Sequence, residues 1–471
     1  MGQDNKYIFD IDSFDVEEND QRKEKRRKKH KKKRMMSWIF LLLFVFTIII
    51  LGYAGVKMLV KGLDLKLPTK QEQVTPEVVD NVDEDTSELD KLITDEEEVV
   101  IAPPEPTEVE PTENDLFEEA IRGYIGKMSL EEKVAGIFIV SPEQITDVEI
   151  ATRAGDGTKA ALEQYPVGGI VYQAKNMTDK DQFSNMLAKT KEYSKYPLFL
   201  AVDEELGNST FSKEMKVTST MTPKEIGANA DPTVAYLEEE KIANYLVSSN
   251  INLNFGVVAD PLTDPDNEVM RTRSFGENAA LCGEMASKCV DALHEYKIAA
   301  AVKFFPGQAS ASQDTSNSLS VSNRSADDMR ASEFTSFKAV IDAGADMVLV
   351  SHISAPNLTG DNTQCSQSKF VMTDLLRNEL GCDDVVIITD SLTKAAISSY
   401  LDSKEASIHA IKAGADMVMC PEDFKEAYAG VIEAVNGGVI AKERIDDSLV
   451  RIYKIKFKGM TPEEINAMVT E

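Results

Sequence analysis

The sequence predicts an α/β protein with a (β/α)8, TIM-like barrel behind an N-terminal transmembrane helix and an acidic linker. Short apolar runs alternate with helix-like segments over about 345 residues, which is the pattern of such a barrel. Polar residues gather where several of these runs end. A long uncharged stretch near the N-terminus has the length of a membrane span.

The N-terminal region predicts a membrane anchor. Trp38–Val56 holds no charged residue and would span roughly 28 Å as a helix, close to the thickness of a bilayer core. Arg22–Arg34 carries eleven Lys or Arg against one Glu, so residues 1–36 should stay in the cytoplasm. A signal peptide is the alternative, but its apolar region is shorter and ends at a small-residue cleavage site. We therefore expect a single-pass cell-membrane protein, anchored by residues 37–57, whose barrel is extracellular.

The composition of residues 58–471 indicates a linker and argues against two kinds of binding site. Residues 58–113 are rich in Asp, Glu and Pro, which predicts an extended linker. The net charge of -29 argues against a nucleic-acid-binding body in residues 114–471. Five cysteines without a CxxC spacing argue against a zinc site. A Cys365–Cys382 bridge is one option in an oxidising exterior, and the sequence leaves it open.

Eight apolar runs are the predicted strands, and between most of them lie helix-like segments such as 278–296, 327–342 and 404–413. An open doubly wound sheet is the alternative to a barrel, but no GxGxxG follows any run, which weakens a dinucleotide-binding interpretation. The runs are 137–140, 168–172, 198–202, 251–255, 299–303, 347–350, 385–389 and 416–420.

Charged and polar residues follow the predicted strands. Asp390 directly follows the seventh run, where it could act in catalysis or cap the next helix. Asp203, Asp260, Lys303 and His352 stand at or just after the ends of four other runs. The C-terminal ends of barrel strands converge on one mouth, so these side chains should form a site for a polar ligand.

Several stretches, in order over about residues 116–460, together resemble the N-terminal barrel domain of glycoside hydrolase family 3. Its single-domain β-N-acetylhexosaminidases are the most similar branch. No single stretch decides the resemblance, and the ordered set carries it. The stretches are Met128–Val134, Val167–Val171, Val202–Glu205, Asn252–Asp260, Arg273–Gly276, Lys303–Gly307, Ile387–Leu392 and Glu443–Ser448.

The resemblance implies roles for individual residues. Asp390 would be the nucleophile of a retaining reaction that forms a glycosyl-enzyme intermediate. Asp203, Arg273 and Lys303 would hold sugar hydroxyls. His352, at a strand end, is predicted to have a structural or sugar-orienting role. The family mechanism needs no metal or cofactor.

The sequence also departs from the family pattern. Phe304 and Gln308 replace two His of the Lys-His-Phe-Pro-Gly-type motif, and Phe211 stands near the place of a sugar-gripping Arg. Asp314 keeps the Asp of the Asp-x-His acid/base pair, but Ser316 stands where the His belongs. A serine hydroxyl cannot protonate a leaving oxygen as an imidazolium does, and losing an acid/base typically costs on the order of 10²–10⁴ in rate.

Three functions are therefore open. The first is a membrane-anchored, retaining glycosidase acting on cell-wall or other N-acetylglucosamine glycans, possible peptidoglycan fragments included, with the acid role moved to Asp314, Glu204 or Glu205. The second is a glycan-binding pseudoenzyme with little or no turnover. The third is an envelope scaffold that presents its surface to a protein partner.

Overall fold

The computed structural model describes residues 112–207, 211, 219–311 and 313–470. The predicted cytoplasmic tail, anchor and nearly all of the linker lie outside these residues. Within the described part of the chain, no helix combines the length and apolar character needed to cross a membrane.

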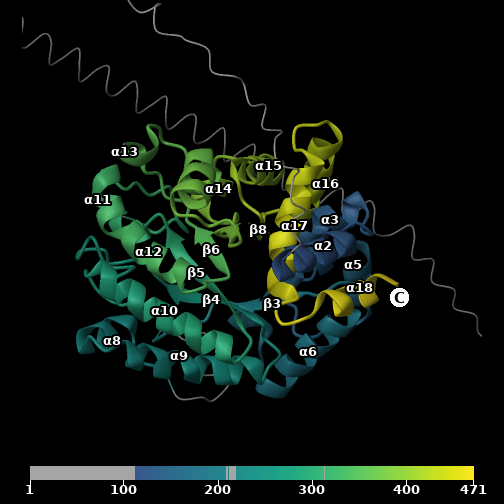
Figure 1. Ribbon diagram of the computed structural model, residues 1–471, viewed down its shortest axis with the longest axis horizontal. Helices are drawn as coiled ribbons and strands as arrows, with labels where there is room; N and C mark the ends of the chain where they lie inside the picture. The colour runs from purple at the N-terminus through teal and green to yellow at the C-terminus, as the bar shows by residue number, and fades with distance from the viewer. Residues whose placement is uncertain (1–111, 208–210, 212–218, 312, 471) are drawn as a thin grey trace, which may run out of the picture. The chain divides into compact units, whose positions relative to one another are not determined.

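The described strands form one parallel barrel (Figure 1). In the sheet the order is β7-β6-β5-β4-β3-β2-β1-β8, and a parallel bridge between Ile388 and Met417 connects β7 to the segment that enters β8. The predicted barrel is confirmed, and β4 continues to Val258 instead of ending at Phe255. The strands are β1 Phe138–Val140, β2 Gly169–Val171, β3 Phe199–Val202, β4 Leu253–Val258, β5 Ala299–Phe305, β6 Met347–Val350, β7 Val386–Thr389 and β8 Val418–Met419.

Helices surround the barrel, and in Figure 1 α9 and α10 run side by side outside β4 and β5. The α-helices are α2 Glu113–Ile125, α3 Leu130–Gly136, α4 Pro142–Thr146, α5 Asp156–Gln164, α6 Lys180–Tyr193, α8 Pro223–Asn229, α9 Pro232–Val247, α10 Ala279–Glu295, α11 Ala326–Ala331, α12 Glu333–Asp342, α13 Pro356–Thr359, α14 Ala395–Ser398, α15 Ser403–Ala413, α16 Phe424–Asn436, α17 Lys442–Lys456 and α18 Pro462–Thr470. A π-helix, η4, covers Phe370–Glu379, and short 3-10 turns are η1 Ala174–Asn176, η2 Gln308–Ser310 and η3 Cys365–Gln367.

Local sequence signals explain several helix boundaries. Ser129 and Glu132 form the capping box that starts α3, with the Glu132 amide 3.2 Å from Ser129 Oγ and the Ser129 amide 2.8 Å from Glu132 Oε2. The predicted segment 327–342 is not one helix, because Ser332 leaves the helical conformation (φ −121°, ψ −85°) and separates α11 from α12. The helix-like segments 278–296 and 404–413 are confirmed as α10 and α15.

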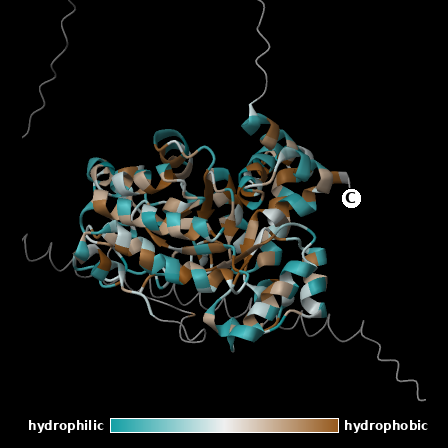
Figure 2. Ribbon diagram, turned by 60° about the horizontal axis from the view of Figure 1, so that its bottom comes forward, coloured by the Kyte–Doolittle hydropathy of each residue, from teal (hydrophilic) through white to brown (hydrophobic). Residues whose placement is uncertain are grey.

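The core lies between the strands and the surrounding helices. Figure 2 shows apolar strands in the interior, while polar residues colour the outward faces of many helices. All five cysteines are buried and free, so Cys365 and Cys382 form no bridge. Burial of both faces of a parallel sheet explains why the strands could be recognised as unbroken apolar runs.

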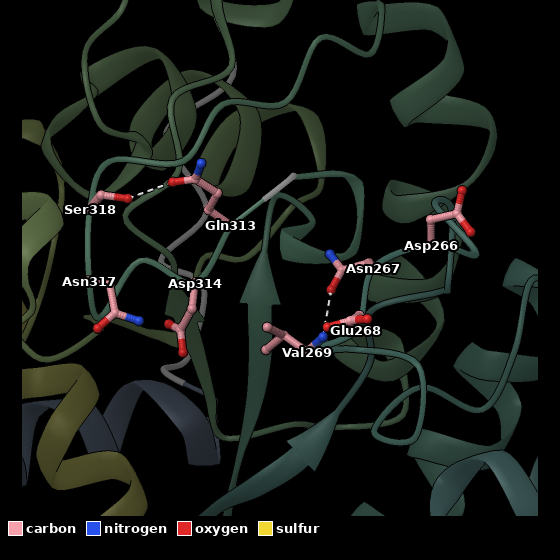
Figure 3. A pocket seen from close by; sticks show the side chains of 8 residues that line it. All are labelled: Asp266, Asn267, Glu268, Val269, Gln313, Asp314, Asn317 and Ser318. Atoms are coloured by element: carbon pink, nitrogen blue, oxygen red, sulfur yellow. Dashed lines mark hydrogen bonds between the residues drawn. The ribbon is translucent and has the colours of Figure 1, made fainter.

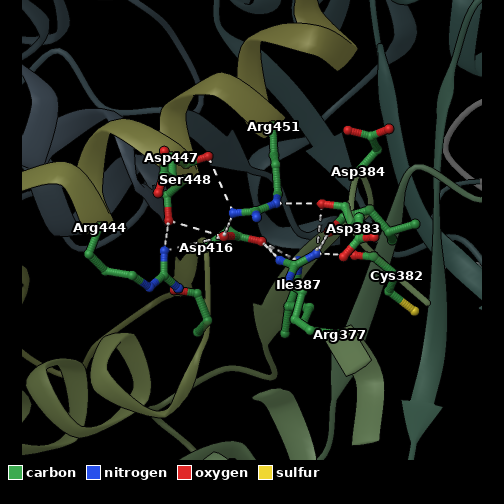
Figure 4. Close-up of polar contacts among 12 residues, drawn as sticks. Arg377, Cys382, Asp383, Asp384, Ile387, Asp416, Arg444, Asp447, Ser448 and Arg451 are labelled. Carbon is green, nitrogen blue, oxygen red and sulfur yellow. Dashed lines mark hydrogen bonds and ion pairs between the residues drawn. The ribbon is translucent and has the colours of Figure 1, made fainter. Parts of the chain in front are cut away.

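A second feature of the fold is an ionic cluster before β8, which we call the base cluster: Asp416 with Arg377, Arg444 and Arg451. All three guanidinium groups point towards the fully buried Asp416 carboxylate (Figure 4). Asp416 also accepts the Ile387 amide at 2.9 Å. The cluster therefore connects η4, the start of β7, the approach to β8 and α17.

Candidate active site

The barrel brings three of the predicted site residues together at the C-terminal ends of β3, β4 and β5. Lys303 Nζ forms ion pairs with Asp203 and with Glu205 Oε1, the latter at 2.5 Å. Arg273 makes a bidentate pair with Glu205, at 2.7 Å from Nε and 2.6 Å from Nη2. The Lys303 side chain is fully buried, whereas that of Asp203 is 55% exposed, so the cluster meets solvent at Asp203.

The charges of this cluster are mutually stabilised. Burial alone would lower the pKa of the Lys303 ammonium, but Asp203 and Glu205 outweigh it and raise that pKa. Burial would raise the pKa of Glu205, but Lys303 and Arg273 lower it to about 2. Glu205 is therefore ionised at neutral pH, holds the two cations, and cannot supply a proton to a leaving group.

Glu204 points to a different environment. It is buried, and its carboxylate accepts the Tyr245 hydroxyl at 2.5 Å and the Phe211 amide at 3.2 Å. Phe211 itself stacks on Phe183, with ring centroids 5.5 Å apart, and is buried. Glu204 thus links the turn after β3 to α9, which favours a structural role over the acid role considered from sequence.

Phe304 provides the aromatic surface at the centre of the site. The Arg273 guanidinium carbon lies 4.9 Å from its ring centroid and Lys303 Nζ lies 5.0 Å from it. A third cation, Lys394 Nζ, lies 5.7 Å from the same centroid. All three distances are within the range of cation–π attraction, so Phe304 gathers these cations over one ring.

Asp390 lies next to this group, immediately after β7. Its Oδ1 accepts the Ser391 amide at 2.7 Å and its Oδ2 accepts from Lys394 Nζ at 2.5 Å. Burial acts to raise the pKa of Asp390, but the Lys394 ammonium and the Ser391 amide, which both hydrogen-bond to the carboxylate, outweigh burial and the pKa is lowered. Asp390 is therefore a buried, ionised carboxylate at the barrel mouth, which is the state a nucleophile requires.

His352 is fully buried after β6, and both ring nitrogens have protein partners. Nε2 lies 2.9 Å from the Ser391 carbonyl oxygen and Nδ1 lies 2.6 Å from Ser366 Oγ. A carbonyl only accepts, so Nε2 carries the proton and Nδ1 accepts from the serine hydroxyl. Burial lowers the pKa of the ring, which is therefore neutral. His352 holds the turn that follows Asp390, and contact with a sugar stays a prediction.

Asp260, which also follows a strand, is directed elsewhere. Its Oδ2 accepts the Ala309 amide at 2.9 Å, and burial raises its pKa well above the ordinary value. Asp260 therefore supports the loop after β5. No group of three His, Cys, Asp or Glu among the described residues is placed to hold a metal ion.

Asp314 lies in the loop after β5 and lines a pocket of about 520 Å³. Figure 3 shows Asp314 and Asn317 on one side of it and Asn267, Glu268 and Val269 on the other. Asp314 Oδ1 accepts the Ser316 amide at 2.8 Å. Burial would lower the pKa of Arg273, but Glu205 outweighs it and raises that pKa, with smaller contributions from the charges of Asp203 and Asp314. Asp314 is therefore electrostatically coupled to the cation group around Phe304.

The loop that carries Asp314 also touches the segment after Asp390. The Ala395 amide lies 3.3 Å from the Ser316 carbonyl oxygen, and the Ala396 amide lies 3.2 Å from that of Thr315.

Two functional features were not predicted from the sequence: the contact of Lys394 with Asp390, and the pairing of Glu205 with both Arg273 and Lys303. Only the first had a sequence signal, since Lys394 stands four residues after Asp390.

Comparison with known proteins decides the family. The model of the "Glycosyl hydrolase family 3 N terminal domain" matches residues 129–455, well over half of the chain. The chain belongs to glycoside hydrolase family 3. The match covers all eight strands and every predicted site residue, so the resemblance inferred from the sequence motifs is confirmed.

The relatives that the chain matches include beta-hexosaminidases. The chain is 28% identical over 326 residues to beta-hexosaminidase A of Pseudoalteromonas piscicida, which covers 63% of this chain and 54% of that protein. It is 29% identical over 280 residues to a beta-hexosaminidase of Stenotrophomonas maltophilia, and this match covers 57% of this chain and 81% of that protein. The chain thus spans about half the length of the first of these relatives.

A solved structure agrees with this placement. The family 3 beta-N-acetylglucosaminidase from Paenibacillus sp. str. FPU-7 superposes with a TM-score of 0.66 at 27% identity, covering 73% of this chain and 68% of that chain. The chain is therefore a β-hexosaminidase-like member of family 3.

Proposed function

We propose that this family 3 member is a retaining β-N-acetylhexosaminidase-like glycosidase with Asp390 as its nucleophile. One observation carries the proposal: Asp390, an ionised carboxylate directly after the seventh strand, pairs with Lys394, which lies by the same Phe304 ring as Arg273 and Lys303. An ionised carboxylate next to fixed hydrogen-bond donors suits attack on an anomeric carbon, with the donors gripping sugar hydroxyls.

The steps follow from these positions. Asp390 forms a bond to the anomeric carbon while the glycosidic bond breaks, and water later hydrolyses the ester to give net retention. Asp203, Arg273 and Lys303 hold the sugar. We assign the proton-donor role to Asp314, because it lines an open pocket and its charge reaches Arg273, which supports a position near the bound sugar, whereas Glu205 is held ionised.

The substrate and location are part of the same proposal. Cell-wall or other N-acetylglucosamine glycans, peptidoglycan fragments included, fit an extracellular barrel on a membrane anchor. The uncharged stretch Trp38–Val56 and the basic cluster before it support the anchor. The β-hexosaminidase relatives support an N-acetylated sugar.

A second function is favoured by two specific observations. Lys394 pairs directly with Asp390, and Ser316 replaces the expected His of the acid/base pair. Both lower the expected rate of turnover. A glycan-binding protein with impaired catalysis is therefore the alternative, and it would hold the sugar with the same residues.

The test measures hydrolysis by the full-length chain of two aryl N-acetyl-β-glucosaminides, one with a phenol and one with a dinitrophenol leaving group. Asp314→Asn should lower the rate with the phenol by about 10²–10⁴-fold, the usual contribution of an acid/base. Dinitrophenolate leaves without protonation, so its release from the enzyme should change far less. Asp327→Asn, an exposed Asp on α11, is the control and should change neither rate.

The outcomes separate the functions. Equal losses with both leaving groups would remove Asp314 from the acid role. Sugar binding without release of either phenol would favour the glycan-binding alternative. Absence of both binding and release would contradict a carbohydrate site and favour a scaffold.

A further inference from the structure

Lys394 differs from the other cations around Phe304 in its carboxylate partner. Lys303 pairs with Asp203 and Glu205, and Arg273 pairs with Glu205. Lys394 pairs with Asp390, the carboxylate proposed to attack the sugar. Its ammonium lies 2.5 Å from Oδ2, while the Ser391 amide takes Oδ1, so both oxygens of Asp390 already accept hydrogen bonds.

The ammonium also lies close to the two cations that are proposed to bind the sugar. Its distance of 5.7 Å from the Phe304 ring centroid places it beside the same ring as Arg273 and Lys303. Arg273 and Lys303 are proposed to bind the sugar. A ligand held by them must therefore compete with Lys394 for the space in front of Asp390.

The ion pair should stabilise the site before attack more than after it. Attack converts the Asp390 carboxylate into a neutral ester, so Lys394 would lose its counter-charge while its side chain is only 22% exposed. An interaction that is stronger in the ground state than in the transition state slows the reaction. Lys394 as seen here therefore opposes attack by Asp390.

We propose that Lys394 is a positioning residue that restrains the nucleophile: it holds Asp390 in a closed ion pair that a bound sugar must open. The inference rests on the proposed function of Asp390. Opening is sterically simple, because Lys394 is a long, partly exposed side chain in the turn before α14. The residues just after it, Ala395 and Ala396, contact the loop that carries Asp314, so ligand contacts with that loop can reach Lys394.

A fluorinated N-acetylglucosaminyl fluoride tests the restraint directly. Asp390 bonds to the anomeric carbon, the carbon–fluorine bond breaks, and fluoride leaves with the electron pair, so no proton donor is needed. The second, ring fluorine slows hydrolysis of the ester, and the labelled protein accumulates. The measurement is the rate of mass gain of the full-length chain, with the label located by peptide mapping.

Lys394→Met keeps the length of the side chain and removes its charge. We expect labelling of Asp390 at least about tenfold faster than in the unmodified chain, which corresponds to about 1.4 kcal/mol of barrier. Lys394→Arg should restore slow labelling, because it restores the ion pair. Lys404→Met is the control, since Lys404 pairs with Glu433 at the surface, and it should leave the rate unchanged.

The pH profile gives a second readout that a merely structural lysine would not move. Lys394 lowers the pKa of Asp390, so in Lys394→Met the acid limb of the labelling rate should shift to higher pH. If Lys394→Met does not fold, shown by its circular dichroism, Lys394→Gln replaces it.

Each outcome bears on the proposal. Label on Asp390 at equal or lower rates in the Met variant would overturn the restraint while leaving the nucleophile assignment intact. No label on Asp390 in any variant would overturn both the restraint and the proposed function.

Discussion

The mouth and the base of the barrel each hold buried charges, but they are built differently. At the base, three guanidinium groups, the Ser448 hydroxyl and the Ile387 amide surround the single carboxylate of Asp416. At the mouth, each of several carboxylates shares one or two cations, and the Asp203 side chain is 55% exposed. The base cluster is closed by protein groups, whereas the mouth remains open to a ligand.

The difference teaches how to separate structural from functional charge. Asp416 accepts from five groups on segments that are far apart in sequence. These contacts hold η4, β7 and α17 to the segment before β8, so they are structural. Among the described residues, Asp390 accepts from one cation and one neighbouring amide, and that cation is itself partly exposed. Buried charge alone therefore does not identify a site, whereas incomplete enclosure by protein partners does.

The largest effect is expected at the mouth. Asp390→Asn should lower kcat for an aryl N-acetyl-β-glucosaminide by roughly 10⁴–10⁶-fold, the scale of losing a nucleophile. Its free energy of unfolding should fall by only about 1–2 kcal/mol, the scale of one charge-assisted hydrogen bond, because the partly exposed Lys394 can turn to solvent. Steady-state kinetics and urea denaturation measure the two quantities. A large loss of stability would place Asp390 with the structural charges of the base.

The converse is expected at the base. Asp416→Asn leaves three guanidinium groups around a neutral amide, and breaking a buried charge pair in this way costs about 3–5 kcal/mol of unfolding free energy. The midpoint of urea denaturation measures it. Asp384→Asn is the matched control, since Asp384 pairs with Lys454 but its side chain is 73% exposed, and it should cost about 1 kcal/mol or less. Similar shifts in both variants would contradict a structural role for the base cluster.

A smaller, pH-dependent effect on the free energy of unfolding is expected at Glu239 on α9. Burial, with the charge of Glu204, raises the pKa of Glu239 on α9 to about 8 from an ordinary 4.5. Between these values the folded chain keeps a proton that the unfolded chain loses, so stability should fall as pH rises from 4.5 to 8. Glu239→Gln should remove that part of the fall, and the neighbouring Glu240→Gln should retain it.

Urea midpoints at four pH values across this window measure the slope. The carboxylate of Glu204, the Cys289 thiol and the Asn254 amide are the groups that influence Glu239. An unchanged slope in Glu239→Gln would show that Glu239 is ionised in the folded chain.

Much of the barrel was predictable because local patterns report burial. Each strand is buried on both faces, so each was visible as an apolar run, and even the two-residue β8 fell within the predicted run 416–420. The break at Ser332 was not predictable, since apolar spacing continues across it. Asp203 and Lys303 were expected to meet because parallel strand ends converge, and Arg273 was expected to join them because of the family resemblance. In the structure Lys303 pairs with Asp203, and Glu205 pairs with both Lys303 and Arg273.

The sequence by itself determined the barrel and several residues that gather at its mouth, because residue periodicity and strand-end position are local properties. It also indicated the family, through an ordered set of motifs that resemble those of family 3. Only the tertiary structure decided which charge meets which. It directed Glu204 towards α9, occupied both nitrogens of His352 and set Lys394 against Asp390. Ion pairs depend on distances of a few ångströms between segments that folding alone brings together, and a sequence does not record those distances.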